Sequence, residues 1–165
     1  FAKTEKEHPD IHLTIMGDGE LREELEHRIA AYGLVNKINI LGITDHVADF
    51  LKQADIYVMS SDLEGLPLSV LEAMACCLPI ITTAAGGVVD IVKDGENGIV
   101  TPTGDVTALS DAMIELIENN ALRKAYGEAS RERAREFDIR SCVEKYQKLY
   151  LDGKLEEECD KQYEI

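Results

Sequence analysis

The sequence lacks a C-x-x-C pair and long apolar runs, and both absences exclude classes of protein. Its four cysteines form no C-x-x-C pair, so neither a disulfide framework nor a zinc site is expected. We expect Cys76 and Cys77 to be reduced thiols that pack inside the fold. No apolar run approaches the ~18 residues that a membrane-spanning helix needs.

Basic residues are also scarce: 17 stand against 32 acidic ones, which gives a formal net charge of -15. Such a surface repels phosphate backbones and anionic lipid, so we expect no nucleic acid as a partner. A small anionic ligand is still compatible with this charge. Backbone N–H groups at a helix N-terminus bind phosphate without any lysine.

Apolar and polar residues alternate in a way that predicts strands and helices in turn along the 165 residues. The predicted strands cover residues 11–16, 37–43, 55–61, 78–83 and part of 94–102. A first predicted helix ends near Pro9, and the other predicted helices cover 20–32, 46–54, 67–77, 105–120, 121–137 and 139–153. Asp105 is the expected N-cap of the helix at 105–120. Leu21, Leu25 and Ile29 form one apolar stripe of the predicted helix at 20–32. The alternation favours an α/β fold of one domain, with a Rossmann-like, doubly wound parallel sheet covered by helices on both faces.

Ligands of such sheets bind outside the carboxyl ends of the strands. This rule selects four loops rich in Gly, Ser or Thr, at residues 17–19, 42–44, 60–67 and 83–87. The first, Gly17-Asp18-Gly19, lacks the third glycine of a dinucleotide fingerprint because Arg22 stands there, so we expect no nicotinamide site. A turn that approaches a ligand and a turn with no ligand both fit its glycines.

Glu72 is the only formally charged side chain between Gly65 and Val89. We expect it to be buried, and a buried carboxylate is costly unless hydrogen-bond donors satisfy it. A sugar diol supplies two such donors. A buried ion pair with Arg or Lys, or a side chain that points to solvent, would fit the residues equally well.

A second glutamate, Glu64, stands eight residues earlier, just before the predicted helix start at Pro67. Proline suits the first helical position because its missing N–H costs nothing there. The free N–H groups near Pro67, Leu68 and Ser69 would stabilise an anion. One helix therefore offers two carboxylates that flank a phosphate-sized site.

The stretch EGLPLSVLEAM, residues 64–74, resembles the E-x7-E motif of the retaining GT-B glycosyltransferases, the large family 4-like group. Residues 54–105 are similar, almost without gaps, to the donor-binding half of that family. The segments IHLTIMGDGELREEL and INILGITDHVADFLKQADIYV match its preceding strands and helices. The resemblance covers residues 9–150, essentially the whole chain.

The resemblance implies a role for each motif residue. Glu72 would accept the two ribose hydroxyls of a nucleotide diphosphate. Glu64 would be the catalytic residue, binding hydroxyls of the transferred sugar near the reacting carbon, and the backbone of Gly65, Leu66 and Pro67 would line that sugar. The other implied contacts are the amides of Leu68 and Ser69 with the distal phosphate, Gly42 and Ile43 with the base, and Gly17 and Gly19 with the diphosphate.

The resemblance also implies a donor that is a UDP-, GDP- or ADP-sugar, with no metal and no other cofactor. The full-length enzyme would be a retaining hexosyltransferase that moves a hexose or N-acetylhexosamine onto a saccharide or lipid-linked acceptor. We expect residues 1–165 to be its donor-binding domain, without the N-terminal acceptor half and without the first strand. The isolated chain should be inactive. We expect a cytoplasmic protein that touches the inner face of the membrane only through the missing half.

Some features depart from the family or leave alternatives. Cys77 replaces the usual glycine, which we interpret as a packing change. The strands at 11–16 and 55–61 either pair directly or leave a gap for another chain. The apolar stripe of Val143, Tyr146 and Tyr150 belongs to the core or to a contact with the missing half. We expect residues 155–160 to be a frayed acidic end. Rival functions are a nucleotide-sugar 2-epimerase of the same architecture and a non-catalytic flavodoxin-like interaction module.

Overall fold

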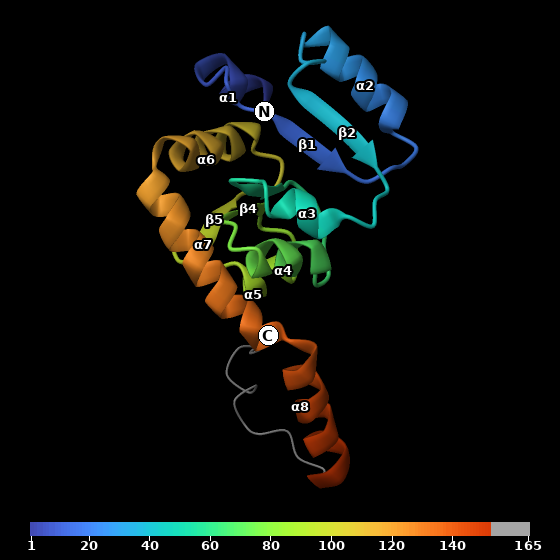
Figure 1. Ribbon diagram of the computed structural model, residues 1–165, viewed down its shortest axis with the longest axis vertical. Helices are drawn as coiled ribbons and strands as arrows, with labels where there is room; N and C mark the ends of the chain where they lie inside the picture. Colours follow the sequence, from blue (N-terminus) through green and yellow to red (C-terminus); the bar gives the residue numbers. More distant parts are fainter. Residues whose placement is uncertain (153–165) are drawn as a thin grey trace.

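The strands form two parallel sheets rather than one in the computed structural model, which describes residues 1–152 (Figure 1). The first sheet pairs β1 (Leu13–Met16) with β2 (Ile38–Gly42). The second has the order β3-β4-β5, with bounds Tyr57–Met59, Ile80–Thr83 and Gly98–Thr101. Within the described part of the chain, β1 does not pair with β3. Direct pairing of these two strands, one of the two expectations, is therefore wrong.

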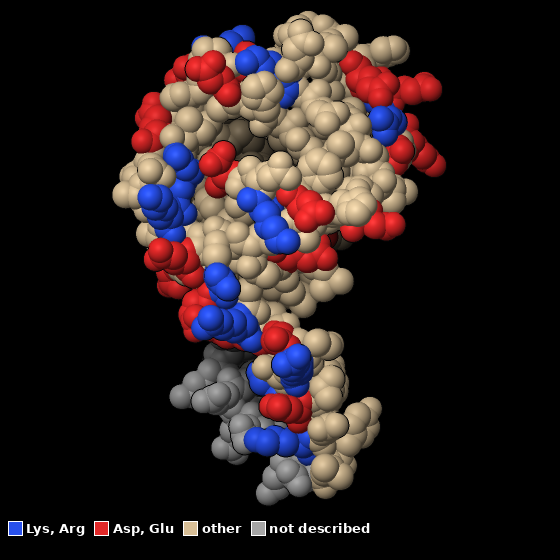
Figure 2. Space-filling view, viewed as in Figure 1, with Lys and Arg blue, Asp and Glu red and all other residues tan. Residues whose placement is uncertain are grey.

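Helices connect and cover these strands, so the predicted α/β class is confirmed. Their bounds are α1 Ala2–Glu7, α2 Arg22–Ala31, α3 Val47–Leu51, α4 Leu68–Ala75, α5 Val88–Ile91, α6 Val106–Glu118, α7 Asn120–Ala134, the 3-10 turn η1 Arg135–Phe137 and α8 Ile139–Asp152. The sequence pattern predicted all of them except α5, a single turn, and η1, which the prediction made the last turn of α7. Figure 2 shows acidic side chains gathered over α2 and basic ones along α7.

The three-stranded sheet is buried on both faces. Every residue of β4 is buried, and its two isoleucines belong to different apolar clusters. Ile80 packs with Val70 and Met74 of α4, whereas Ile81 packs with Met113 of α6 and its neighbours. This half of the molecule therefore has the doubly wound arrangement that the alternating pattern predicts.

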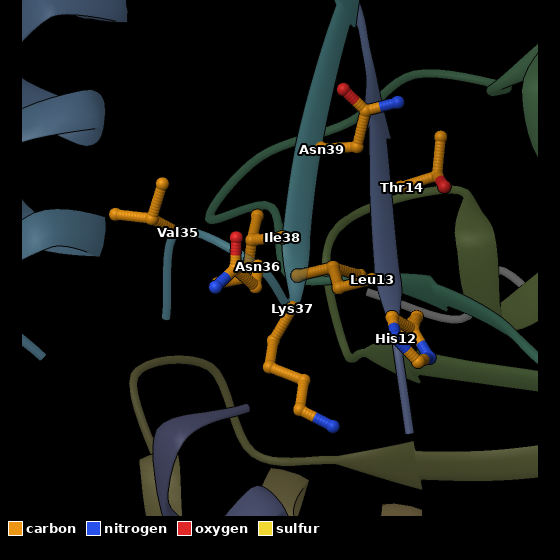
Figure 3. Close-up of a pocket in the computed structure, with 8 residues that line it drawn as sticks. All are labelled: His12, Leu13, Thr14, Val35, Asn36, Lys37, Ile38 and Asn39. Atoms are coloured by element: carbon orange, nitrogen blue, oxygen red, sulfur yellow. The ribbon is translucent and has the colours of Figure 1, made fainter. Parts of the chain in front are cut away.

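The two-stranded sheet is covered less completely than the three-stranded sheet. Thr14 and Asn39 are register partners on one face of it, and both side chains are exposed. A groove of about 360 Å³ lies along these strands. Figure 3 shows His12 and Lys37 toward one end of it and Thr14 and Asn39 toward the other. In Figure 2 the surface is also hollowed between α6 and the β1–β2 sheet.

Helix ends follow local chemistry in most places. The Asp105 carboxylate accepts hydrogen bonds from the N–H groups of Thr107 and Ala108, at 3.0 and 2.9 Å, and so caps α6 as predicted. Gly33 adopts the left-handed conformation, with φ of 72°, after α2. Leu21 of the predicted apolar stripe is 71% exposed and precedes α2, which begins at Arg22 rather than at Glu20.

Two more expectations about burial need correction. Cys76 and Cys77 are free thiols, as predicted, but both are half-buried rather than buried. Val143, Tyr146 and Tyr150 of α8 are exposed, so this stripe does not belong to the core. Figure 1 shows α8 leading away from the body of the molecule after η1.

The frayed end expected at residues 155–160 lies outside the described residues. Of the helices in residues 1–152, none combines the length and the apolar composition needed to cross a bilayer.

Candidate functional site

The four predicted loops come together in two pairs, one at each sheet. In the first pair, the Gly17 N–H donates a 2.9 Å hydrogen bond to the Gly42 carbonyl oxygen. Both glycines have positive φ, 138° and 75°, a conformation that side chains disfavour. Gly19 is exposed and Ile43 is 86% exposed, so this corner is open to a ligand. Of the predicted contacts, Gly17, Gly19 and Ile43 are exposed at this corner, whereas Gly42 is buried.

Arg22 lies in the same corner, and the sequence reasoning treated it only as a missing glycine. Its Nη1 is 3.3 Å from Asp18 Oδ2, its Nη2 donates to the Ile40 carbonyl, and its Nε is 2.9 Å from Glu26 Oε1. A side chain at Gly42 would contact this guanidinium. The first loop pair thus contains a cation, already paired with two carboxylates.

The second pair joins residues 60–67 to residues 83–87. The Thr83 hydroxyl donates a 2.5 Å hydrogen bond to the Ser61 carbonyl oxygen, and the Gly87 N–H donates one of 3.4 Å to the carbonyl of Glu64. Side chains at Gly86 and Gly87 would overlap the carbonyl oxygens of Glu64 and Gly65. The loop that carries Glu64 is therefore in main-chain contact with the turn before α5.

Glu64 is half-buried at the mouth of this loop. The Ser61 hydroxyl donates a 2.6 Å hydrogen bond to Glu64 Oε1. In residues 1–152 no basic side chain forms an ion pair with Glu64. Its second carboxylate oxygen has no partner there either, so it keeps its full capacity to accept hydrogen bonds from a ligand.

Glu72 is exposed, and the expectation that it is buried is wrong. Helix α4 buries its other face, through Val70, Ala73 and Met74, and leaves Glu72 on the open side. Of the three arrangements that fitted the sequence, the structure shows the one that points to solvent. Over the described range, Glu72 has no ion pair and no side-chain hydrogen bond. Burial therefore does not demand a sugar diol, although the carboxylate is free to bind one.

The N-terminus of α4 lies between the two glutamates along the chain. Pro67 is the N-cap, with φ of -72°, rather than the first helical residue, and no side chain caps the helix. Leu68 is 68% exposed and Ser69 is exposed as well. The first-turn N–H groups therefore lack a side-chain acceptor, as an anion site at a helix N-terminus requires.

Tyr57 of β3 completes this surface and was missed by the sequence reasoning. Its side chain packs against the core and lies near the Ser69 side chain. Burial raises the pKa of the Tyr57 phenol above its ordinary value, the Ser69 side chain lowers it, and the negative charges of Glu64 and Glu72 raise it further. One phenol is thus close enough to sense both motif glutamates. A polar residue within an apolar strand was the available signal.

The groove in Figure 3 is separate from these residues, because it lies on β1, β2 and the turn before β2 rather than at the carboxyl ends of the strands. No group of three or more His, Cys, Asp or Glu side chains in the described residues is arranged to hold a metal ion. The structure records no hydrogen bond between the two loop pairs among residues 1–152. They stand on separate sheets.

Comparison with known proteins identifies the family. Residues 1–133 match the model of glycosyl transferases group 1, and the chain belongs to this family. It is 32% identical over 153 residues to the N-acetyl-alpha-D-glucosaminyl L-malate synthase of Bacillus anthracis. That match covers 92% of this chain and 40% of the relative. The chain thus spans less than half of this relative's length.

Solved structures confirm the predicted fold, the C-terminal half of a GT-B glycosyltransferase. A variant of S. aureus TarM, crystallised with Fondaparinux, alpha-GlcNAc-glycerol and UDP, has a TM-score of 0.84 at 23% identity. The match covers 91% of this chain and 31% of TarM. The C-terminal domain of the group 1 glycosyltransferase LpcC from Francisella tularensis has a TM-score of 0.73 at 28% identity, and 72% of that domain is covered by 80% of this chain.

Proposed function

We propose that this chain is the nucleotide-sugar-binding domain of a retaining hexosyltransferase whose other half binds the acceptor. One observation carries the proposal. Glu64 and Glu72 stand on either side of an uncapped helix N-terminus, with no cation paired to either in the described residues. Two carboxylates that can accept further hydrogen bonds, beside N–H donors without a side-chain acceptor, match a ligand that combines hydroxyls with phosphate. Membership of glycosyl transferases group 1 supports the same assignment.

In this proposal each element has a role in binding the donor. Glu72 accepts the ribose hydroxyls, and the N–H groups of Leu68 and Ser69 bind the distal phosphate. Glu64 accepts hydroxyls of the sugar, which lies along the backbone of Gly65 to Pro67. The first loop pair, with Gly17, Gly19, Gly42 and Ile43, contacts the diphosphate and the base.

The reaction breaks the bond between the anomeric carbon of the sugar and the oxygen of the nucleoside diphosphate. The acceptor hydroxyl forms the new bond on the same face, and its proton leaves with the diphosphate. Negative charge develops on the departing phosphate oxygen, where the first-turn N–H groups of α4 stabilise it. Metal-independent transfer remains a prediction from the resemblance, and chelation with EDTA tests it on the full-length enzyme.

The donor sugar that we propose is a hexose or an N-acetylhexosamine. The malate synthase is named for an N-acetylglucosaminyl group, and the TarM crystal contains alpha-GlcNAc-glycerol. One relative and one fold neighbour therefore support an N-acetylhexosamine. The acceptor, a saccharide or a lipid-linked sugar, would bind through the other half. We propose a cytoplasmic location, with any membrane contact made by that half.

Titration of UDP, GDP and ADP, followed by amide chemical shifts, tests this proposal. Shifts should concentrate at residues 17–19, 42–44 and 64–72. Glu72→Gln should weaken the preferred nucleotide by roughly 1.5–3 kcal/mol, because charged hydrogen bonds to the ribose are lost. Glu115→Gln, a change of an exposed glutamate on α6, is the matched control and should leave affinity unchanged. If Glu72→Gln leaves the nucleotide affinity unchanged, or if the chemical-shift changes are confined to other residues, the result would support a non-catalytic interaction module instead.

A further inference from the structure

The hydrogen bond from Ser61 to Glu64 is short and belongs to a chain of contacts that reaches the core. At 2.6 Å, the distance from Ser61 Oγ to Glu64 Oε1 is typical of a hydroxyl that donates to a carboxylate. The serine occupies only one carboxylate oxygen. Its donation therefore restrains the orientation of the carboxylate and leaves the other oxygen without a partner in the described residues.

Ser61 is itself held from β4. Thr83, the last residue of that strand, is 3% exposed and donates its hydroxyl proton to the Ser61 carbonyl oxygen at 2.5 Å. On the next strand, the Thr101 hydroxyl donates to the Thr82 carbonyl at 3.3 Å, and Thr83 is the register partner of Thr101. The buried sheet thus fixes the main chain at Ser61, three residues before the motif glutamate.

The loop is supported from its other side as well. Gly86 and Gly87 lie against the carbonyl groups of Glu64 and Gly65, where no side chain would fit. The Gly87 N–H donates to the Glu64 carbonyl at 3.4 Å. With its main chain held at both ends, the remaining freedom of Glu64 is the rotation of its side chain, which Ser61 restrains.

We infer that Ser61 is a positioning residue, which holds the Glu64 carboxylate in the orientation that meets the sugar of the donor. This inference rests on the proposed function and adds a residue to the same site. A glutamate side chain has several rotatable bonds, and their restriction before binding removes an entropic penalty. Because the bare nucleotide lacks the transferred sugar, Ser61 should influence nucleotide-sugar binding and leave nucleotide binding unaffected.

The test compares UDP, GDP and ADP with UDP-glucose, GDP-glucose and ADP-glucose by calorimetry on the 165-residue chain. For the pair that binds the original sequence best, Ser61→Ala should lower the affinity for the nucleotide-sugar by about three- to tenfold. The affinity for the nucleotide should stay within about twofold. Ser61→Thr keeps the hydroxyl and should bind the nucleotide-sugar with the affinity of the original sequence. Ser60→Ala, which changes the exposed neighbouring serine, is the matched control.

A second measurement needs no ligand. Side-chain coupling constants of Glu64 should report one preferred rotamer in the original sequence and in Ser60→Ala, and rotational averaging in Ser61→Ala. Equal losses for nucleotide and nucleotide-sugar, or unchanged couplings in Ser61→Ala, would overturn the inference. If none of the six compounds binds, the proposed function is wrong, whereas the couplings still decide whether Ser61 orients Glu64.

Discussion

The carbonyl oxygen of Cys77 lies against the Cα of Gly127, so closely that any side chain at Gly127 would overlap it. This contact joins Cys77, two residues after the end of α4, to the middle of α7, and the two helices pack together. Cys77 is also the only residue other than glycine with positive φ in the described part of the chain, at 62°. The expectation that Cys77 in place of glycine is a simple packing change is therefore wrong, because the difference lies in the backbone.

Cys77→Gly should raise the free energy of unfolding by about 1 kcal/mol. The left-handed conformation costs an ordinary residue roughly 1–2 kcal/mol, of which the greater freedom of glycine in the unfolded chain offsets a part. Urea unfolding under reducing conditions measures the change. Cys77→Ser keeps a side chain in the same conformation and is the control, with no gain expected. If both variants gained equally, the thiol rather than the backbone would be responsible.

Gly127→Ala should lower the free energy of unfolding by about 1–3 kcal/mol, since the added methyl group forces α7 away from the end of α4. This effect opposes the intrinsic helix propensity, which favours alanine over glycine by about 1 kcal/mol. The sign of the change therefore separates the two effects. Glu128→Ala, at an exposed neighbour on the same helix, should change stability little. A stabilised Gly127→Ala variant would show that the helices tolerate the methyl group.

The fold could be predicted where local pattern decides it, and the site only in part. Apolar alternation placed the strands, and Asp105 fixed the start of α6. The exposure of Glu72 could not be predicted, because an apolar run in the sequence does not reveal that one face of α4 lacks a covering element. The separation of β1 from β3 could not be predicted for a similar reason, because strand pairing depends on which strands are neighbours in space. Ser61 could have been found from the sequence, because its hydroxyl stands three residues before Glu64.

The two sheets should differ in local stability. A two-stranded sheet with one exposed face is marginal by itself, whereas β4 is buried between neighbours on both sides. We expect the amide of Ile15 in β1 to exchange with solvent at least about tenfold faster than that of Ile81 in β4, because local opening of the β1–β2 sheet precedes global unfolding. Hydrogen exchange followed by NMR measures both rates. Equal protection at the two positions would mean that the sheets open as one unit.

Tyr57 should make the protein sensitive to alkaline pH, because burial and the charges of Glu64 and Glu72 raise its pKa. A raised phenol pKa means that the folded state holds the proton more tightly than the unfolded chain, whose tyrosines titrate near ~10. The resulting stability is fully present below that pH and is lost as the pH rises through the higher folded value. Tyr57→Phe cannot ionise, so its free energy of unfolding should fall less between pH 9 and pH 12 in urea titrations (about the range where phenols ionise).

Glu72→Gln removes one of the two negative charges and should lower the alkaline midpoint of Tyr57, followed by ultraviolet absorbance. If the alkaline midpoint of Tyr57 is the same in Glu72→Gln, the phenol does not lie close to that carboxylate. This result would contradict the interpretation that β3 and α4 present one continuous polar surface.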